Sequence, residues 1–459
     1  MAAAIWRNIV GFVQGAVAYL TPWRNSTALQ TERIDEALRY LEQNRVGELR
    51  KRFIAPIRLL LPDSVLDRGW KDVCTTFGRL KGAGDPAISK GWLISTIKVP
   101  LQFDNARFGL LLHMTLGGSL VGLRFVPLHR LGLGQGWRAP RYADKNHREF
   151  DICLGTGEFK VGGTLCLPPA QAKTSKWPCV VLVAGSGPCD RHSTVEENKP
   201  FSDLAWGLAG QDIASIRFDK VTHAHSKAFR KKKKNVTLTD EYVEHVVAAL
   251  SYARGHPDIL PDKVFLLGHS LGAVVAPKIA LLHQSVAGCI IMAGPAEPIY
   301  RCLVRQLRYI ESLGGPEAPY LGRQIEQAQS QAAVADSNSL NLSTPAKNLP
   351  FGIGPAYWLD YRKFDPLGSA RSLSKPILVL QGGRDYQVTV KDDYERWQLA
   401  LQGKSNAQFR LYSRLNHLFI AGDRPSTPLE YSVPGNVDEL VITDISTWIS
   451  ECLSAVSQG

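Results

Sequence analysis

Short apolar runs alternate with amphipathic segments along the C-terminal two thirds of the chain. The runs have the length of buried strands and lie at residues 179–184, 214–218, 264–267, 288–292, 377–381 and 408–412. Helical periodicity lies between them, most clearly at residues 238–254 and 271–283. This alternation is typical of a mostly parallel sheet with helices on both faces, because each strand is then buried on both sides. We therefore expect an α/β fold, opened by a hairpin at residues 150–154 and 161–167.

An amphipathic segment at residues 436–453 ends the pattern. Its apolar residues recur about every 3.6 positions, which predicts a helix. Asn436 and Glu439 have the spacing of a capping box, in which two side chains bind free amides of the first turn. The pattern therefore predicts that this helix begins at Asn436.

The N-terminal part of the chain has a different organisation. Ile34, Leu38, Leu41 and Val46 have the spacing of an amphipathic helix. Three strand-like runs follow, at residues 93–99, 107–115 and 120–126. This order predicts a small α+β domain at residues 30–130, preceded by a tail or helix at residues 1–29. Residues 131–148 are rich in Gly, Arg and Pro and lack periodicity, so we place a linker there. Residues 149–459 then form the main domain.

Composition is that of an ordinary globular protein, with 44% hydrophobic and 21% charged residues among 459. No run reaches the roughly 18 apolar residues that a membrane-spanning helix needs. Eight cysteines are scattered without a C-x-x-C pair, which favours reduced, mostly structural thiols. The net charge is 54 − 42 = +12, and residues 230–234 are all basic. No aromatic residue lies among these five to stack on bases, so we interpret them as a solvated loop and expect no nucleic-acid partner.

An apolar stretch at residues 9–20 leaves the localisation open. Arg7 precedes it, and Ala16-Val17-Ala18 has the pattern of a signal-peptide cleavage site. Gln14 and two glycines weaken its apolar core, so a helix docked on the protein or on a membrane surface also fits. We expect a cytoplasmic protein, with secretion or membrane association through this stretch as the alternative.

Gly268-His269-Ser270-Leu271-Gly272 is a G-x-S-x-G sequence in an informative context. It follows the apolar run at 264–267 and precedes the helical segment at 271–283. A strand, a sharp turn and a helix form a nucleophile elbow, whose glycines let the backbones approach closely. Ser270 is therefore the expected nucleophile, at a helix N-terminus that favours developing negative charge.

A serine nucleophile needs a base and an acid, which follow it in the order acid, then His, in this class of fold. His417 follows the run at 408–412 and is the only histidine after His283. Asp385 follows the run at 377–381, so both lie at carboxyl ends of strands, where α/β proteins place their sites. We expect His417 to act as the base and Asp385 to orient it. Four other aspartates compete for the acid role without directly following a strong apolar strand: Asp360, Asp365, Asp392 and Asp393.

Two backbone amides should stabilise the oxyanion that forms when Ser270 attacks a carbonyl. Leu271 follows the nucleophile and is one expected donor. The second should come from the loop after the strand at 179–184, with the sequence Ala184-Gly185-Ser186-Gly187-Pro188. We assign it to Ser186, with Gly187 as the alternative.

Residues 296–366 separate two predicted strands and have the position of a lid. Its aromatic residues include Tyr300, Tyr320, Tyr357, Trp358 and Tyr361. Such rings either line a substrate pocket or pack the lid onto the body; we assign Tyr357 and Trp358 to the pocket as a hypothesis, together with Gly187 and His269. There is no dinucleotide fingerprint, and His223 and His225 lack further ligands nearby in the sequence, so we expect no cofactor and no metal.

Four segments together resemble a group of α/β-hydrolase serine esterases, mostly bacterial. They are residues 185–191 with 198–201, the elbow at 268–272, residues 383–388 and residues 415–419. The resemblance spans nearly all of residues 149–459 and implies an α/β-hydrolase fold with a Ser–His–Asp triad. Residues 30–130 resemble, through Trp70 and Phe77-Gly78, the small α+β domain of unassigned role that often precedes this hydrolase.

These features favour a serine hydrolase that cleaves carboxylic esters of small molecules through an acyl-enzyme. The same triad serves acyl transfer, thioester cleavage and cyclisation, so an enzyme of natural-product (polyketide-type) biosynthesis, and hence of secondary metabolism, is the first alternative. A catalytically inactive scaffold is the second. The sequence leaves open the natural ester or thioester substrate and whether the chain forms a homodimer.

Overall fold

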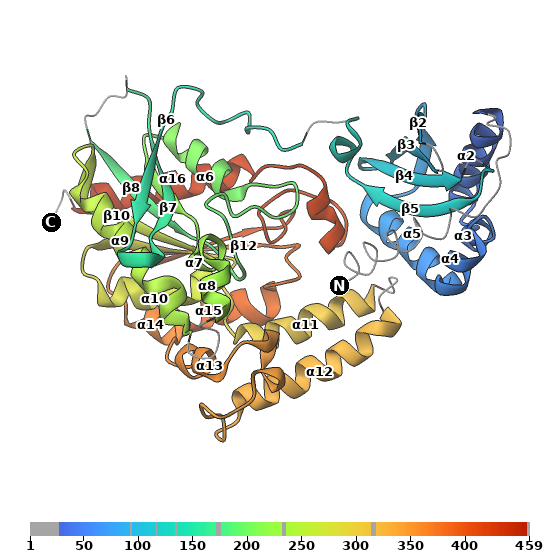
Figure 1. Ribbon diagram of the computed structural model, residues 1–459. Coiled ribbons are helices and arrows are strands. Elements are labelled where there is room, and N and C mark those ends of the chain that lie inside the picture. Colours follow the sequence, from blue (N-terminus) through green and yellow to red (C-terminus); the bar gives the residue numbers. More distant parts are fainter. Residues whose placement is uncertain are drawn as a thin grey trace. The chain divides into compact units, whose positions relative to one another are not determined.

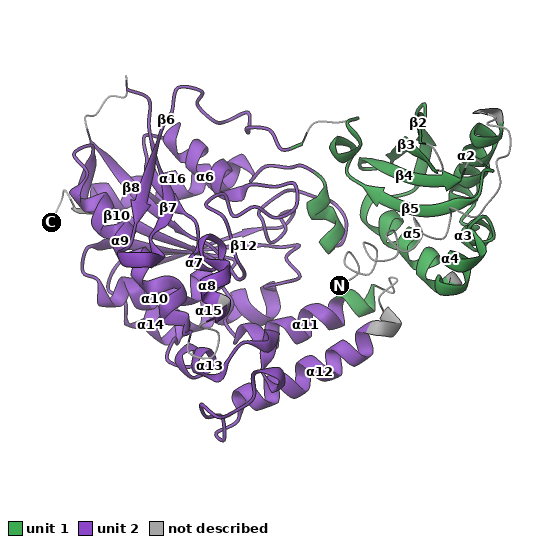
Figure 2. Ribbon diagram, viewed as in Figure 1, with its two compact units in different colours: residues 1–136, 310–319, 427–433 green, residues 137–309, 320–426, 434–459 purple. Residues whose placement is uncertain are grey.

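The computed structural model describes residues 27–91, 94–115, 117–133, 136–170, 176–231, 236–313 and 318–456 (Figure 1). The chain divides into two units, coloured separately in Figure 2. One comprises residues 1–136, 310–319 and 427–433, and the other comprises residues 137–309, 320–426 and 434–459. The apolar stretch at residues 9–20, most of the expected tail and most of the basic run lie outside the described residues. Within the described ranges, no helix has both the length and the apolar character to cross a membrane.

An eight-stranded sheet forms the centre of the larger unit, in the order β13-β12-β11-β10-β8-β9-β7-β6. Its strands are β6 (Arg148–Leu154), β7 (Val161–Leu167), β8 (Trp177–Val183), β9 (Ala214–Phe218), β10 (Ile259–His269), β11 (Val286–Met292), β12 (Ile377–Gly382) and β13 (Ala407–Tyr412). β7 is antiparallel to both of its neighbours, and the other pairs are parallel. The predicted mostly parallel α/β-hydrolase sheet is thus confirmed, and β6 and β7 form the predicted hairpin.

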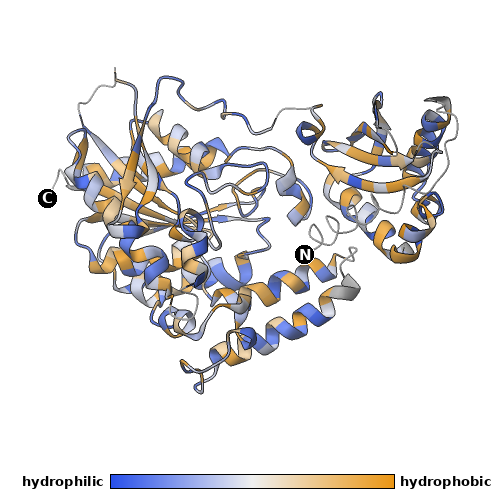
Figure 3. Cartoon of the chain, viewed as in Figure 1, coloured by the Kyte–Doolittle hydropathy of each residue, from blue (hydrophilic) through white to orange (hydrophobic). Residues whose placement is uncertain are grey.

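Alternate residues of the central strands point to opposite faces of the sheet, and each face has its own core. In β8, Cys179, Val181 and Val183 pack in the core that includes helices α9 (Leu238–Gly255) and α10 (Leu271–Leu282). Val180 and Leu182 pack in the opposite core with α6 (Pro200–Ala209) and α16 (Glu439–Val456). The central strands are accordingly hydrophobic along their length (Figure 3). Burial on both faces explains why β8 is an uninterrupted apolar run.

The start of α16 differs from the prediction. The helix begins at Glu439, and the side chain of Asp438 accepts a hydrogen bond from the Leu440 amide at 3.0 Å. Asn436 instead donates to the carboxylate of the buried Asp203 in α6, at 3.0 Å. The expected capping box is therefore wrong, because Asn436 bonds to α6 and lies ahead of the helix.

The smaller unit has the predicted α+β architecture. Helices come first: α2 (Thr27–Glu42), α3 (Val46–Arg50), α4 (Ala55–Leu60) and α5 (Asp63–Phe77). An antiparallel sheet follows: β1 (Leu80–Ala83), β2 (Ala87–Lys90), β3 (Ile94–Phe103), β4 (Arg107–Thr115) and β5 (Leu120–Val126). Trp70 and Phe77 are buried between the two layers, where the Phe77 ring lies 4.8 Å from that of Phe108. Gly78 ends α5 with a φ of 91°, a conformation that glycine adopts without strain.

The segment between β11 and β12 is largely helical. It contains α11 (Ile299–Ser312), α12 (Ala318–Asp336), α13 (Pro355–Tyr361) and α14 (Pro366–Ser372). An ion pair of 2.8 Å between Arg301 of α11 and Asp336 of α12 joins the first two helices, which lie side by side (Figure 1).

Candidate active site

Ser270 occupies a sharp turn between β10 and α10. Its φ of 55° and ψ of −120° are strained values for a residue with a side chain. Its amide donates to the carbonyl of Met292 at the end of β11, at 3.0 Å, which holds the turn against the sheet. Strand, strained turn and helix together form the geometry of a nucleophile elbow.

The two glycines of the motif are required by close packing. A Cβ on Gly272 would lie 2.2 Å from the carbonyl oxygen of Val183, and one on Gly268 would lie 2.3 Å from the carbonyl oxygen of Gly272. Backbone atoms cannot yield as a flexible side chain can. Only glycine therefore lets α10 start this close to β8 and β10.

His417 and Asp385 form a buried hydrogen-bonded pair at the ends of β13 and β12. The Nδ1–H of His417 donates to Oδ2 of Asp385 at 2.7 Å. The other oxygen, Oδ1, accepts from the amides of Gln387 and Val388 at 2.8 and 2.9 Å. Both carboxylate oxygens thus have fixed partners, so Asp385 orients the imidazole and sets which nitrogen carries the proton.

The competing aspartates are engaged elsewhere. Asp360 accepts from the amide of Thr239, and Asp365 caps α14 by accepting from the Gly368 amide at 2.9 Å. Asp392 and Asp393 both pair with Arg305. Among the four, no side-chain contact to His417 is found in the described residues.

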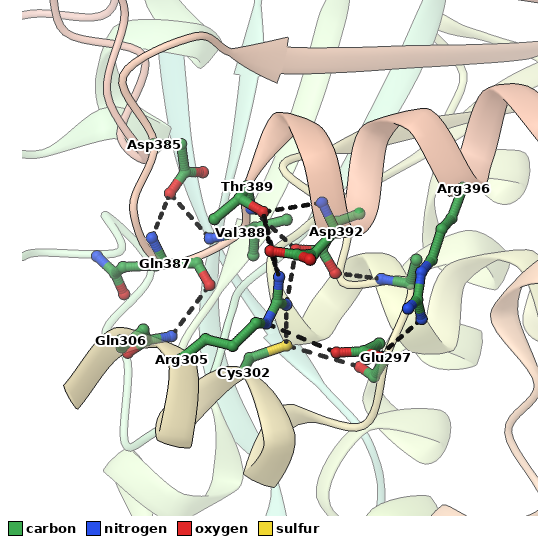
Figure 4. Close-up of polar contacts among 12 residues, drawn as sticks. Glu297, Cys302, Arg305, Gln306, Asp385, Gln387, Val388, Thr389, Asp392 and Arg396 are labelled. Carbon is green, nitrogen blue, oxygen red and sulfur yellow. Dashed lines mark hydrogen bonds and ion pairs between the residues drawn. The ribbon is translucent and has the colours of Figure 1, made fainter. Parts of the chain in front are cut away.

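Helix α11 holds the loop that follows Asp385 (Figure 4). Arg305 donates to the hydroxyl of Thr389 at 3.1 Å and to the buried carboxylate of Asp393 at 2.8 Å. Burial raises the pKa of Asp393, and the facing guanidinium opposes that rise. Gln306 donates to the carbonyl of Gln387 at 3.2 Å. The segment inserted between β11 and β12 therefore supports the loop that carries Asp385.

His269 links the elbow to the loop that carries His417. Its ring lies 4.8 Å from that of His417, and its Nε2 lies 2.9 Å from the carbonyl oxygen of His417. Burial, with a contribution from His417, lowers the pKa of His269 to about 3, so its ring is neutral and Nε2–H donates. His269, the residue before Ser270, thereby links the Ser270 turn to the backbone of His417.

The loop after β8 passes directly beside Ser270. A Cβ on Gly185 would lie 3.0 Å from Cβ of Ser270 and 3.5 Å from its Oγ. In the part of the chain that the structure describes, the amides of Ser186 and Leu271 donate no hydrogen bond to another group. Both amides are therefore available to an oxyanion on a substrate at Ser270.

A cavity of about 400 Å³ adjoins the elbow. Leu271 and Ser186 line it together with eight mostly apolar or aromatic residues: Pro188, Phe229, Val236, Ile299, Phe351, Ile353, Tyr357 and Trp358. Of the residues assigned to the pocket from the sequence, Gly187, Tyr357 and Trp358 line this cavity, whereas His269 does not, because its ring faces the loop of His417. The polar lining residues Thr222, Ser226 and Glu241 carry no local sequence motif and were not predicted.

His147, Glu149 and Cys166 offer ligand atoms within 4.8 Å of one another, away from the elbow. Glu149 already accepts from Trp206 at 2.6 Å and pairs with the buried Arg217 at 2.7 Å. Burial raises the pKa of Cys166 to about 12, so it remains a thiol. A cationic neighbour and a protonated sulfur make this group a poor metal site.

The chain is similar to known proteins in sequence and in structure. A family model described as serine aminopeptidase, S33, matches residues 191–337. Esterase EstD of Thermotoga maritima is 33% identical over 352 residues, which cover 76% of this chain and 78% of that protein. Among solved structures, Est1E from Butyrivibrio proteoclasticus has a TM-score of 0.43 at 14% identity and covers 66% of this chain and 99% of its own. The Pyrococcus furiosus esterase PF2001 has a TM-score of 0.40 at 15% identity, covering 69% and 98%. Through its match to EstD, the chain belongs to the α/β-hydrolase serine esterases, which are carboxylic ester hydrolases.

Proposed function

We propose that the chain hydrolyses small-molecule carboxylic esters through an acyl-enzyme on Ser270. The observation that carries this is the 2.7 Å hydrogen bond between His417 and Asp385. His269 connects this pair to the turn at Ser270, because its ring bonds to the carbonyl of His417 and its backbone precedes the strained serine. Ser270 Oγ attacks the ester carbonyl while Nε2 of His417 takes its proton. The C–O bond to the alcohol then breaks, and His417 returns the proton to the leaving alkoxide. Water attacks the acyl-enzyme in the same way, which releases the acid and restores Ser270.

The amides of Ser186 and Leu271 are the proposed oxyanion donors. Both residues line the cavity, and Leu271 is the first residue of α10, where the helix dipole also favours negative charge. Gly187 remains the alternative for the first donor.

The cavity suits an ester with an apolar or aromatic group. Its walls come mainly from aliphatic and aromatic side chains, and residues 296–366 contribute Ile299, Phe351, Ile353, Tyr357 and Trp358. We therefore propose that the segment 296–366 serves as a lid that shapes this pocket.

Covalent labelling tests the mechanism. A fluorophosphonate should add one adduct to the folded protein, and peptide mass analysis should place it on Ser270; Ser270→Ala should be neither labelled nor active on p-nitrophenyl esters. Ser193→Ala is the matched control, because Ser193 is also buried and also has a positive φ, of 52°. A labelled Ser270→Ala, or full ester hydrolysis by it, would refute the acyl-enzyme. A parallel series of esters and thioesters shows whether thioester cleavage is the preferred reaction.

A further inference from the structure

We propose that Lys220 and Tyr242 are positioning residues that fix the Ser186 amide in the oxyanion hole; this inference rests on the function proposed above. Lys220 follows β9, and its Nζ donates to the carbonyl oxygen of Gly185 at 2.8 Å. The hydroxyl of Tyr242, in α9, donates to the same oxygen at 2.6 Å. Both side chains are buried, so water does not compete for these bonds.

The consequence follows from the geometry of the peptide unit. The carbonyl of Gly185 and the N–H of Ser186 belong to one planar trans peptide, in which the two groups point in opposite directions. Two donors that hold the carbonyl on one side therefore aim the Ser186 N–H to the other. Gly185 lies against Ser270, so the orientation of this peptide decides whether an oxyanion at Ser270 meets a donor.

The ammonium also changes the strength of that donor. A cation on the carbonyl oxygen polarises the peptide and makes its N–H a stronger donor to an anion. A neutral donor would give the orientation but less of the polarisation. The charge of Lys220 therefore acts on the reaction through the Gly185–Ser186 peptide, without contact with the substrate.

The surrounding network holds Lys220 in place. Its Nζ also forms a 2.9 Å ion pair with Glu241 and a 2.7 Å hydrogen bond to the oxygen of Tyr242. With Gly185, these partners use all three N–H groups of the ammonium, so Lys220 has no free donor and no lone pair with which to act as a base or nucleophile. Glu241 in turn accepts from the Tyr357 hydroxyl at 2.6 Å.

Kinetics with a transition-state analogue test this role. Two variants remove the ammonium: Lys220→Met and the charge-balanced Lys220→Met/Glu241→Gln. Each should lower kcat on p-nitrophenyl acetate by about 10- to 100-fold, which is less than the loss of an oxyanion donor itself causes. Their KM should stay within about threefold of the wild type. The Ki of a trifluoromethyl ketone, whose adduct places an oxyanion in the hole, should rise by the same factor. Tyr242→Phe should show the same pattern at smaller size and carries the test if the lysine variants do not fold.

Lys375→Met is the matched control. Lys375 also donates to two carbonyls, those of Ala280 and His283 at 2.8 and 2.7 Å, but at the opposite end of α10. Its kcat and Ki should equal those of the wild type. Folded Lys220 and Tyr242 variants with unchanged kcat, or with a loss confined to KM, would overturn the inference. Labelling of wild-type Ser270 separates the two proposals: without it the acyl-enzyme fails, and with it only the role of Lys220 is in question.

Discussion

Replacing Asp385 by Asn tests the triad most sharply, because the structure dictates how the introduced amide must lie. Oδ1 of Asp385 accepts from the amides of Gln387 and Val388, so that position requires an oxygen. The NH₂ group of the introduced asparagine must then occupy the position of Oδ2 and face Nδ1 of His417. A donor there forces Nδ1 to become the acceptor and moves the proton to Nε2, the nitrogen that has to receive the proton of Ser270.

The expected loss can be bounded. Turning the amide over would give up two backbone hydrogen bonds of about 1 kcal/mol each, which limits the turned form to roughly 3% of molecules. The loss in kcat is therefore at least about 30-fold. It reaches ~10⁴-fold, or about 5 kcal/mol of barrier, if the wrong tautomer dominates fully.

The assay is kcat on p-nitrophenyl acetate, with folding checked by circular dichroism. Asp365→Asn is the control, because Asp365 loses the same charge while asparagine still caps α14. That variant should keep wild-type kcat. A folded Asp385→Asn with more than a tenth of the wild-type kcat would show that Asp385 does not set the tautomer of His417.

Two further predictions concern the pocket and pH. Phe351 lines the cavity but is half exposed, so Phe351→Ala should leave the fold intact. It should lower kcat/KM for long-chain or aromatic esters about tenfold relative to the acetate ester, and equal losses on all esters would contradict a pocket role. Burial lowers the pKa of His269 from 6.5 to about 3. Below pH 6.5 the unfolded chain is therefore protonated at His269 while the folded protein is not, so the free energy of unfolding falls as pH falls. Urea unfolding at pH 8 and pH 5 measures how much the free energy of unfolding decreases between the two pH values. In His269→Gln this decrease should be about 2 kcal/mol smaller than in the wild type, and an equal decrease would contradict the burial of a neutral ring.

Local signals were sufficient to predict the sheet and the candidate triad residues. A continuous apolar run marks a strand buried on both faces, and β8 and residues 264–267 of β10 are such runs. The elbow glycines and the positions of Asp385 and His417 after their strands are likewise features of a few consecutive residues. The structure brings Asp385 and His417 together at 2.7 Å because parallel strands end at the same edge of the sheet.

Long-range pairing was beyond these signals. Periodicity was sufficient to locate α16 but not the residue that caps it. The side chain of Asn436, which the motif assigned to the cap, instead bonds to Asp203, 233 residues away in the sequence. Residues 427–433 belong to the smaller unit, where Thr427 bonds to Thr76 across 351 positions at 2.8 Å. Such partners are chosen by the folded geometry, so a pattern within one segment does not contain them.

The same limit explains why the side chains that hold the Gly185–Ser186 loop were not predicted. Tyr242 lies 57 residues from Gly185, and Tyr357 lies 116 residues from Glu241. A buried ion pair carries a desolvation cost that apolar side chains of similar size would avoid, so fold stability alone does not account for Lys220 and Glu241 in the core. The proposed role in orienting one peptide beside Ser270 would account for them, because an apolar side chain cannot hold a carbonyl. Glu241, Lys220 and Tyr242 form a chain of buried polar contacts from Tyr357 in the cavity wall to the Gly185–Ser186 peptide. In the proposed mechanism, a change in the cavity wall at Tyr357 would therefore also act on the donor strength of the Ser186 amide.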